Sequence, residues 1–113
     1  MGTFTVVLRL ADGREIEVLV DTGATFTKLP SRVLEDLGVS ASFERDFEIA
    51  DGSILRRRVG YVEVEVEGRK APVPVAFAED GERALLGATA LEILGFTVDP
   101  QKRRLVPAPA LDV

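Results

Sequence analysis

Two Asp-Gly pairs, each standing between apolar segments, constrain this chain to a fold built from β-hairpins. Asp-Gly is a strong hairpin signal because glycine tolerates the positive φ that tight turns between antiparallel strands require. The first pair lies at 12–13, between the strand-like segments 3–10 (TFTVVLRL) and 14–20 (REIEVLV). The second lies within residues 50–53 and is followed by 59–66 (VGYVEVEV), which alternates as a strand with one wet face does. We therefore expect two hairpins, with Ala-Asp-Gly-Ser at the tip of the longer one.

The rest of the chain predicts short strands and one or two short helices. Apolar residues recur at helical spacing in 31–37 and 88–94, and Gly95 is a plausible stop for the second helix. Segment 71–78 contains two prolines, which cannot donate ladder hydrogen bonds, so we expect this strand to be interrupted or at a sheet edge. The remaining strand-like segments are 43–49, 96–98 and 103–106. The fold class is therefore all-β, in a single domain over residues 1–113.

The residue types that the chain lacks exclude several kinds of catalytic and metal-binding site. The chain has no Cys and no His, which excludes disulfides, thiol nucleophiles, Ser-His triads and Cys/His zinc sites. Any acid–base catalysis must use carboxylates, Lys or Tyr61. The formal net charge of −5 argues against sequence-independent nucleic-acid binding, which depends on cationic contacts to phosphate. We interpret the basic run at 56–58 as part of a solvated strand face, since several glutamates follow it closely.

The sequence shows no sign of membrane association. No apolar run approaches the roughly 18–20 residues needed to cross a bilayer. The N-terminal segment lacks the basic and apolar regions of a signal peptide. Val6 stands where a myristoylation signal requires Ser or Thr. We therefore expect a cytoplasmic protein with no membrane contact.

A carboxylate, Asp21, stands directly after the apolar strand segment 15–20 (EIEVLV). A buried carboxylate is costly unless it is hydrogen-bonded or its pKa shifts. Gly23 permits a tight turn and a close approach of neighbouring backbone, and the hydroxyl of Thr22 can donate one hydrogen bond and accept others. Two interpretations remain open from these residues alone: an ordinary turn that ends a strand, or a loop that presents a catalytic carboxylate.

Three segments in a fixed order place this Asp-Thr-Gly in a wider context. They are VDTGATFTKLP (20–30), the hairpin around ADGS (50–53) with its return VGYVEVEVEG (59–68), and LLGATALEILGFTVDP (85–100). In these segments the sequence resembles the retropepsin-like aspartic proteases, the single-domain relatives of pepsin, and is most similar to their small prokaryotic members. The resemblance implies a closed retropepsin-like β-barrel, one half of a pepsin-type fold.

The resemblance also implies a catalytic arrangement. Asp21 would be the catalytic carboxylate, and Thr22, Gly23 and Ala24 would support its loop. Family members with one such loop per chain work as homodimers, so a water molecule would be activated between two copies of Asp21, one ionised and one protonated. Thr22 would hydrogen-bond across the two-fold axis. The resemblance implies neither a metal nor an organic cofactor.

Two further parts of the site follow from the same resemblance. Hairpin 44–60 would be a flap that closes on an extended peptide or protein substrate through main-chain hydrogen bonds. The tip residues of this flap are Ile49, Ala50, Asp51 and Gly52. The residues expected to pack beneath the active loop are Leu85, Leu86 and Gly87. The sequence departs from the retroviral pattern at Ala88 and Thr89, where relatives usually have Arg and Asp or Asn, so the dimer support of that charged pair must come from elsewhere.

The leading hypothesis is therefore a homodimeric aspartic endopeptidase. One alternative is a non-catalytic dimeric peptide-binding module on the same fold, although catalytically idle relatives often lose the aspartate that this chain keeps. Another is a β-rich dimerisation domain of a larger assembly.

Overall fold

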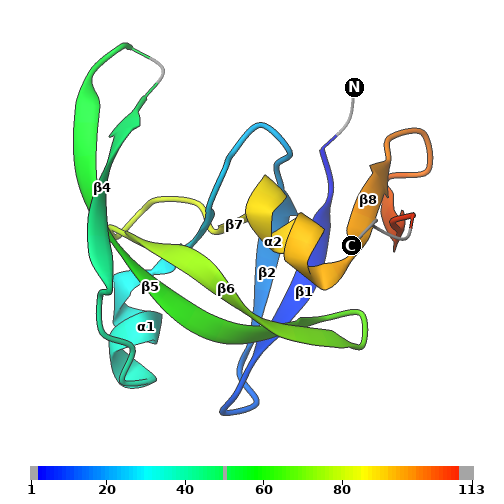
Figure 1. Cartoon of the computed structure of the whole chain (residues 1–113), viewed down its shortest axis with the longest axis horizontal. Coiled ribbons are helices and arrows are strands. Elements are labelled where there is room, and N and C mark those ends of the chain that lie inside the picture. The colour runs from blue at the N-terminus through cyan, green and yellow to red at the C-terminus, as the bar shows by residue number, and fades with distance from the viewer. Residues whose placement is uncertain (1–2, 50, 110–113) are drawn as a thin grey trace.

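The computed structural model describes residues 3–49 and 51–109 of the chain (Figure 1). Along the sequence these residues form β1 (Thr5–Leu10), β2 (Glu15–Val20), β3 (Thr27–Pro30), α1 (Ser31–Asp36), β4 (Phe43–Glu48), β5 (Ile54–Val66), β6 (Arg69–Ala78), β7 (Leu85–Leu86), α2 (Ala88–Leu94), β8 (Phe96–Asp99) and β9 (Arg104–Pro107).

Most of the strands close into a hydrogen-bonded ring. The main sheet has the order β1-β2-β7-β3-β6-β5-β4, and β1 also pairs with β5. The closed ring therefore consists of β1, β2, β7, β3, β6 and β5. Strand β4 extends from the ring through its pairing with β5, and β8 pairs with β9 in a separate two-stranded sheet. The all-β closed fold predicted from the sequence is confirmed, with α1 and α2 as its short helices.

Both predicted Asp-Gly hairpins are present. Strands β1 and β2 are antiparallel and joined by a turn in which Gly13 has a φ of 89°. Strands β4 and β5 pair up to Glu48 opposite Ile54, and Gly52 in the turn between them has a φ of 86°. These are the left-handed conformations that glycine adopts without strain. The predicted stop of the second helix is also confirmed, since α2 ends at Gly95 in the left-handed region.

Strand β6 is continuous, so the expectation that its prolines would interrupt it is wrong. It pairs with β5 along its length, with Pro72 opposite Glu63 and Pro74 opposite Tyr61. On its other side the pairing with β3 begins at Val75. Both prolines precede that point and therefore lie at a local sheet edge, where their missing N–H groups are not needed for a ladder. The alternative expectation, an edge position, is correct for this half of the strand.

The inward faces of the ring strands form one apolar core. In β5, Val62, Val64 and Val66 are buried, whereas Tyr61 and Glu63 face outward, which is the two-residue period of a strand with one buried face. Helix α2 contributes Ala90, Leu91 and Leu94 to the same core. The ring is therefore filled by side chains.

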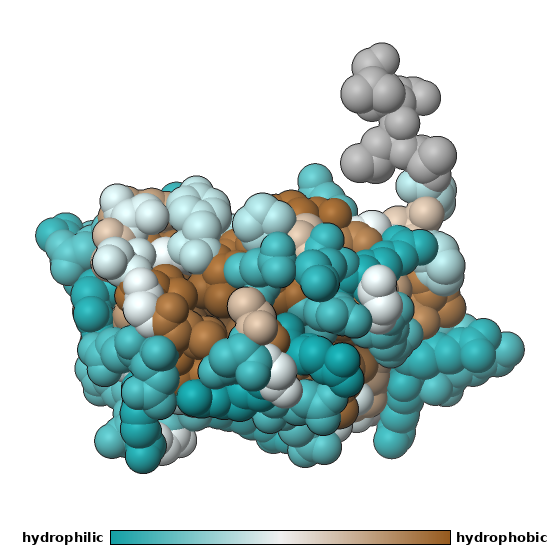
Figure 2. Space-filling model, turned by 90° about the horizontal axis from the view of Figure 1, so that it is seen from below, coloured by the Kyte–Doolittle hydropathy of each residue, from teal (hydrophilic) through white to brown (hydrophobic). Residues whose placement is uncertain are grey.

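Hydrophilic residues cover most of the face of the molecule that Figure 2 shows, where they surround smaller areas of hydrophobic residues. In the part of the chain that the structure describes, no helix combines the length and the apolar character needed to cross a membrane.

Candidate active site

The active loop (residues 21–25) follows β2 directly and is held by backbone hydrogen bonds. The Asp21 N–H donates to the Leu86 carbonyl at 3.0 Å, and the Ala24 N–H donates to the Asp21 carbonyl at 3.2 Å. The Gly23 N–H donates to Asp21 Oδ1 at 3.0 Å. These bonds make the loop a tight turn that also sets the direction of a half-buried carboxylate.

The segment after β6 supports this loop. Strand β7 pairs in parallel with β2, so Leu85 and Leu86 lie beside the last two residues of that strand. The Ala88 N–H then donates to the Ala24 carbonyl at 2.7 Å. Ala88, which departs from the retroviral pattern, thus contributes through its backbone, and the start of α2 is tied to the active loop.

Gly87 occupies a position where no side chain fits. A Cβ there would lie 2.6 Å from both the carbonyl carbon and the carbonyl oxygen of Phe26, and 2.9 Å from the Ala24 carbonyl oxygen. The Gly87 N–H donates to Thr27 Oγ1 at 3.0 Å, and Thr27 is fully buried. Glycine is therefore needed for close backbone approach, and its buried N–H is satisfied.

The tip of the active loop is open to solvent. Thr22 and Gly23 are exposed, whereas Ala24 is half-buried. Thr22 lines a hollow of about 360 Å³ together with residues of α2 and β8, among them Ala88 and Phe96. The loop therefore presents Asp21 to one space and Thr22 to another.

The β4–β5 hairpin, called the flap below, projects from the ring (Figure 1). At its tip the Ile49 N–H donates to the Ser53 carbonyl at 3.0 Å, and the Gly52 N–H donates to the Ile49 carbonyl at 2.8 Å. Asp51 Oδ1 accepts hydrogen bonds from the Ser53 hydroxyl at 2.6 Å and the Ser53 N–H at 2.8 Å, and these bonds lower the pKa of the Asp51 carboxyl. Asp51 thus stabilises the turn. Ala50 lies outside the described residues.

Aromatic contacts join the flap to the segment after the active loop. The Phe26 ring lies edge-on to Phe43 and Phe47 of β4, with ring centroids 6.3 and 5.8 Å apart. Such pairs stabilise a preferred geometry beyond simple burial. Nearer the tip, Ile49, Ile54 and Leu55 are exposed. Phe26 therefore contacts β4 at both ends of the strand, and the flap also carries exposed apolar side chains beside its tip.

A cleft of about 510 Å³ lies between the active loop and the flap, within the usual range of roughly 300–1,000 Å³ for ligand sites. Of the residues singled out in the sequence, those that line this cleft are Asp21, Gly23, Ala24, Ile49 and Leu85. The described ones that do not line it are Thr22, Asp51, Gly52, Leu86 and Gly87. The structure therefore brings the Asp21 carboxylate and the flap to one space.

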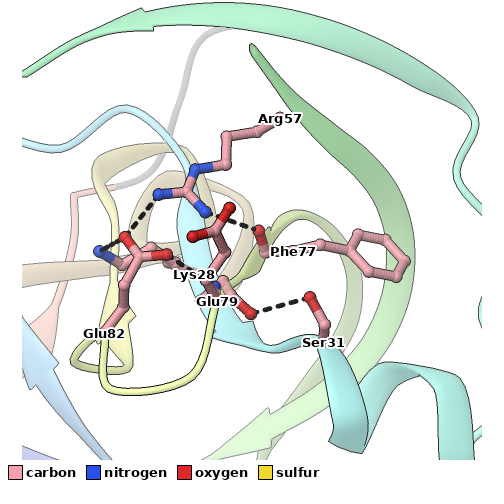
Figure 3. A network of polar contacts seen from close by, with 7 residues as sticks. Lys28, Ser31, Arg57, Phe77, Glu79 and Glu82 are labelled. Carbon is pink, nitrogen blue, oxygen red and sulfur yellow. Dashed lines mark hydrogen bonds and ion pairs between the residues drawn. The ribbon is translucent and has the colours of Figure 1, made fainter. Parts of the chain in front are cut away.

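A charged network in the same cleft was not predicted from the sequence (Figure 3). Glu82 Oε2 accepts a hydrogen bond from Arg57 Nη2 at 2.6 Å and lies 3.4 Å from Lys28 Nζ. The Glu79 N–H donates to Glu82 Oε1 at 2.6 Å, and Arg57 Nη1 donates to the Phe77 carbonyl at 3.4 Å. The three charged side chains, which we call the cleft triad (Lys28, Arg57 and Glu82), come from β3, β5 and the loop before β7.

The basic run at 56–58 is therefore not a uniformly solvated strand face. Its outer members are exposed as expected, but the Arg57 side chain is only 11% exposed and lines the cleft. Alternate residues of a strand face opposite sides, and this alternation was the available signal for Arg57 and also for Lys28, which stands between two buried residues of β3. No local signal marks Glu82 as their partner, because it lies 54 residues from Lys28 and 25 from Arg57.

The ionised carboxylate of Glu82 stabilises the cleft triad and makes it pH-dependent. Burial alone would raise the pKa of Glu82. The hydrogen bonds from the Glu79 N–H and from Arg57, with the charge of Lys28, outweigh burial and hold this pKa below its ordinary value of 4.5. The folded chain therefore binds this proton less tightly than the unfolded chain does. The resulting stabilisation is complete above the ordinary pKa and is lost as the pH falls through the folded one.

We expect Glu82→Gln to lower the free energy of unfolding at neutral pH by about 1.5 kcal/mol, the lower end of the range for hydrogen bonds to a charged group, because the Glu82 side chain is partly exposed. The difference from the parent protein should shrink as the pH falls from the ordinary pKa of 4.5 through the lower pKa of the folded chain, because Glu82 becomes protonated in the folded chain as well. Urea denaturation of both proteins across this pH range measures the difference. The exposed Glu17→Gln variant is the control and should change stability little. A Glu82→Gln effect that is the same at every pH would contradict this account.

Acidic side chains do not gather into a metal site in the described ranges, where no three Asp or Glu side chains lie close enough to share an ion.

A closed ring of strands, with a carboxylate loop and a hairpin flap on either side of a cleft, defines the class of aspartic-protease folds. Comparison with family models agrees, since the model described as aspartyl protease matches residues 6–98. The chain belongs to the aspartyl protease family, and its resemblance to the retropepsin-like members is confirmed. A comparison with curated proteins finds no match. Family membership supports protease activity in general.

Proposed function

We propose that this protein is an aspartic endopeptidase that acts as a homodimer, with water activated between Asp21 and the same residue of the partner. The observation that carries the proposal is the placement of the Asp21 carboxylate. It is oriented by the Gly23 N–H at 3.0 Å, and it lines a cleft that the flap also lines. An oriented acid in a concave site is the arrangement expected of a catalytic carboxylate.

The dimer follows from the number of carboxylates that the reaction needs. One acid must be ionised to take a proton from water, and another must be protonated to hydrogen-bond to the scissile carbonyl. One chain supplies one active loop, so a two-fold axis would bring two loops together. The exposed tip formed by Thr22 and Gly23 is the part of the loop available for that contact, with the Thr22 hydroxyl as the group that would bond across the axis.

The proposed reaction is a general acid–base hydrolysis. The ionised carboxylate removes a proton from water as the water oxygen attacks the carbonyl carbon, while the protonated carboxyl stabilises the developing charge on the carbonyl oxygen. The C–N bond then breaks as the leaving nitrogen takes up a proton from the pair.

The proposed substrate is an extended segment of peptide or protein. A strand-like segment in the cleft could bond through its main chain to the flap and place alternate side chains in pockets. The exposed Ile49, Ile54 and Leu55 side chains would lose contact with water when the flap closes, and burial of apolar surface favours that closure.

Incubation with a mixture of peptides tests the proposal. We expect cleavage products, identified by mass spectrometry, within the acidic to neutral range where a shared proton is available. Saturable peptide binding without cleavage would contradict the protease proposal and favour the dimeric peptide-binding module. Absence of both binding and cleavage would contradict both.

A mixing experiment tests the shared site. When wild-type protein is equilibrated with about a ninefold excess of Asp21→Asn protein, random pairing leaves about one in ten wild-type chains with a wild-type partner. We expect the activity per wild-type chain to fall about tenfold. The same excess of Asp12→Asn protein is the control, because Asp12 lies in the β1–β2 turn, and it should cause no such fall. Activity unaffected by the Asp21→Asn excess would show that each chain works alone.

A further inference from the structure

The alternation of side chains along β3 directs Lys28, one member of the cleft triad, into the cleft. In β3, Thr27 and Leu29 are buried in the core, so Lys28 between them faces the other way, into the cleft. Lys28 is paired across the ring with Ala76 of β6 on one side and Leu85 of β7 on the other, and both also line the cleft. The small side chain of Ala76 leaves room beside the lysine.

The cleft triad has a net positive charge. Lys28 and Arg57 contribute two positive charges and Glu82 contributes one negative charge, so the sum is +2 − 1 = +1. Both cations approach the same oxygen, Glu82 Oε2, while Glu82 Oε1 accepts the Glu79 N–H. Both oxygens of the carboxylate are therefore engaged.

Lys28 is the member with donors to spare. An ammonium group has three N–H donors, and the contact that the described residues offer it is the 3.4 Å approach to Glu82. The Lys28 side chain is 25% exposed, so water reaches it only in part. A ligand carboxylate in the cleft would supply the missing acceptor and the missing negative charge.

Four further charged side chains line the cleft. Asp21 of the active loop is half-buried and carries the carboxylate assigned to the reaction. Arg45, Asp46 and Glu48 lie on β4 and are exposed, and Asp46 is paired with Arg56 at 3.0 Å. Exposed charges are strongly screened by water and salt, whereas partly buried ones are screened much less. Within the cleft lining, the triad is therefore the least screened positive charge, and Asp21 is the least screened negative charge outside the triad.

We propose that the cleft triad is a specificity subsite that selects an acidic side chain of the peptide substrate. This inference rests on the proposed protease function. Because a homodimer places the same subsite on both sides of its two-fold axis, the preference should occur at two substrate positions, equally far from the cleaved bond on either side. The remaining cleft wall, with Phe26, Phe47 and Leu55, would accept apolar side chains.

Matched peptide pairs test this specificity. Each pair differs only in Glu or Gln at one position of a short synthetic peptide, and kcat/KM is measured near neutral pH, where the peptide carboxylate is ionised. We expect the Glu peptide to be cleaved about tenfold faster at the two symmetric positions, which corresponds to about 1.4 kcal/mol of transition-state stabilisation. Binding of the same pairs to Asp21→Asn protein, by fluorescence anisotropy, measures the preference without cleavage.

Two variants change the charge of the triad in opposite directions. Lys28→Gln brings the sum to zero and should abolish the Glu-over-Gln ratio, while Glu82→Gln raises the sum to +2 and should increase it. Lys70→Gln, which removes a lysine outside this cleft, is the matched control and should leave the ratio unchanged. Because the readout is a ratio within each protein, a loss of total activity or stability does not obscure it.

The outcomes separate this inference from the proposed function. Cleavage with equal rates for Glu and Gln peptides would overturn the acidic subsite and leave the protease intact. A binding preference for Glu without any cleavage would support the subsite and overturn the protease. If Lys28→Gln and Glu82→Gln changed only the melting temperature and not the Glu-over-Gln ratio, the triad would serve only to stabilise the fold, and the inference would be wrong.

Discussion

Replacing Asp21 with Asn is expected to reduce kcat/KM for peptide cleavage by at least about 10³-fold, since positioned acid–base groups each contribute roughly 10²–10⁴-fold. Both copies are lost in the homodimer, so neither member of the proposed pair can take a proton from water. The fold should persist, because the Asn side-chain oxygen can still accept the Gly23 N–H that Asp21 Oδ1 accepts at 3.0 Å. Cleavage rates on a defined peptide, together with the melting temperature, measure both parts of this prediction.

The chain offers a close control for this substitution. Asp12 Oδ1 accepts the Arg14 N–H at 2.9 Å, so it caps a turn two residues on in the same way as Asp21 does. It lies in the β1–β2 turn and does not line the cleft. Asp12→Asn makes the same change in charge and keeps the same turn hydrogen bond, although it also weakens an exposed ion pair with Arg14 at 3.4 Å. Activity should remain within a few-fold of wild type. Cleavage that survives in Asp21→Asn would show that another group, or another protein in the sample, performs the reaction.

The parts of the fold that sequence predicts are those determined by neighbouring residues. Asp-Gly turns and the stop at Gly95 depend on the conformation of one glycine each, and the structure has a left-handed glycine at all three places. The alternation along β5 depends on a two-residue period. The continuity of β6 could not be inferred, because whether Pro72 and Pro74 need donors depends on where the β3 ladder begins.

The candidate site likewise has a part that depends on neighbouring residues and a part that depends on long-range contacts. The Asp-Thr-Gly turn is a local motif, and its candidate role could be stated from the sequence together with the order of the flanking segments. The bond from the Gly23 N–H to Asp21 is local as well, but the support of the loop is not: the Asp21 N–H donates to the Leu86 carbonyl, and β7 pairs in parallel with β2. The cleft triad is still less accessible to sequence analysis, because three separate elements must meet before the single surplus charge exists.

Gly87→Ala is expected to lower the free energy of unfolding by about 3 kcal/mol, at the upper end of the range for overpacked positions. The conformation of Gly87, with φ −94° and ψ 176°, is extended and open to any residue, so backbone strain plays no part. The cost is steric: the new Cβ would meet the Phe26 backbone at 2.6 Å, and these are backbone atoms of the segment that carries the active loop. Urea denaturation of both proteins measures the loss.

Gly38→Ala separates steric exclusion from backbone conformation. Gly38 has a φ of 75° and nothing within 4 Å of an added Cβ, so its substitution carries only the left-handed penalty of roughly 1–2 kcal/mol. Gly87→Ala should therefore destabilise more, and it should also reduce kcat/KM among molecules that remain folded, because relief of the clash moves the Ala24 carbonyl that accepts the Ala88 N–H at 2.7 Å. Gly38→Ala should leave that rate unchanged. If Gly87→Ala costs no more than Gly38→Ala, the loop is not held by close backbone contact, and the orientation of Asp21 must depend on its own turn alone.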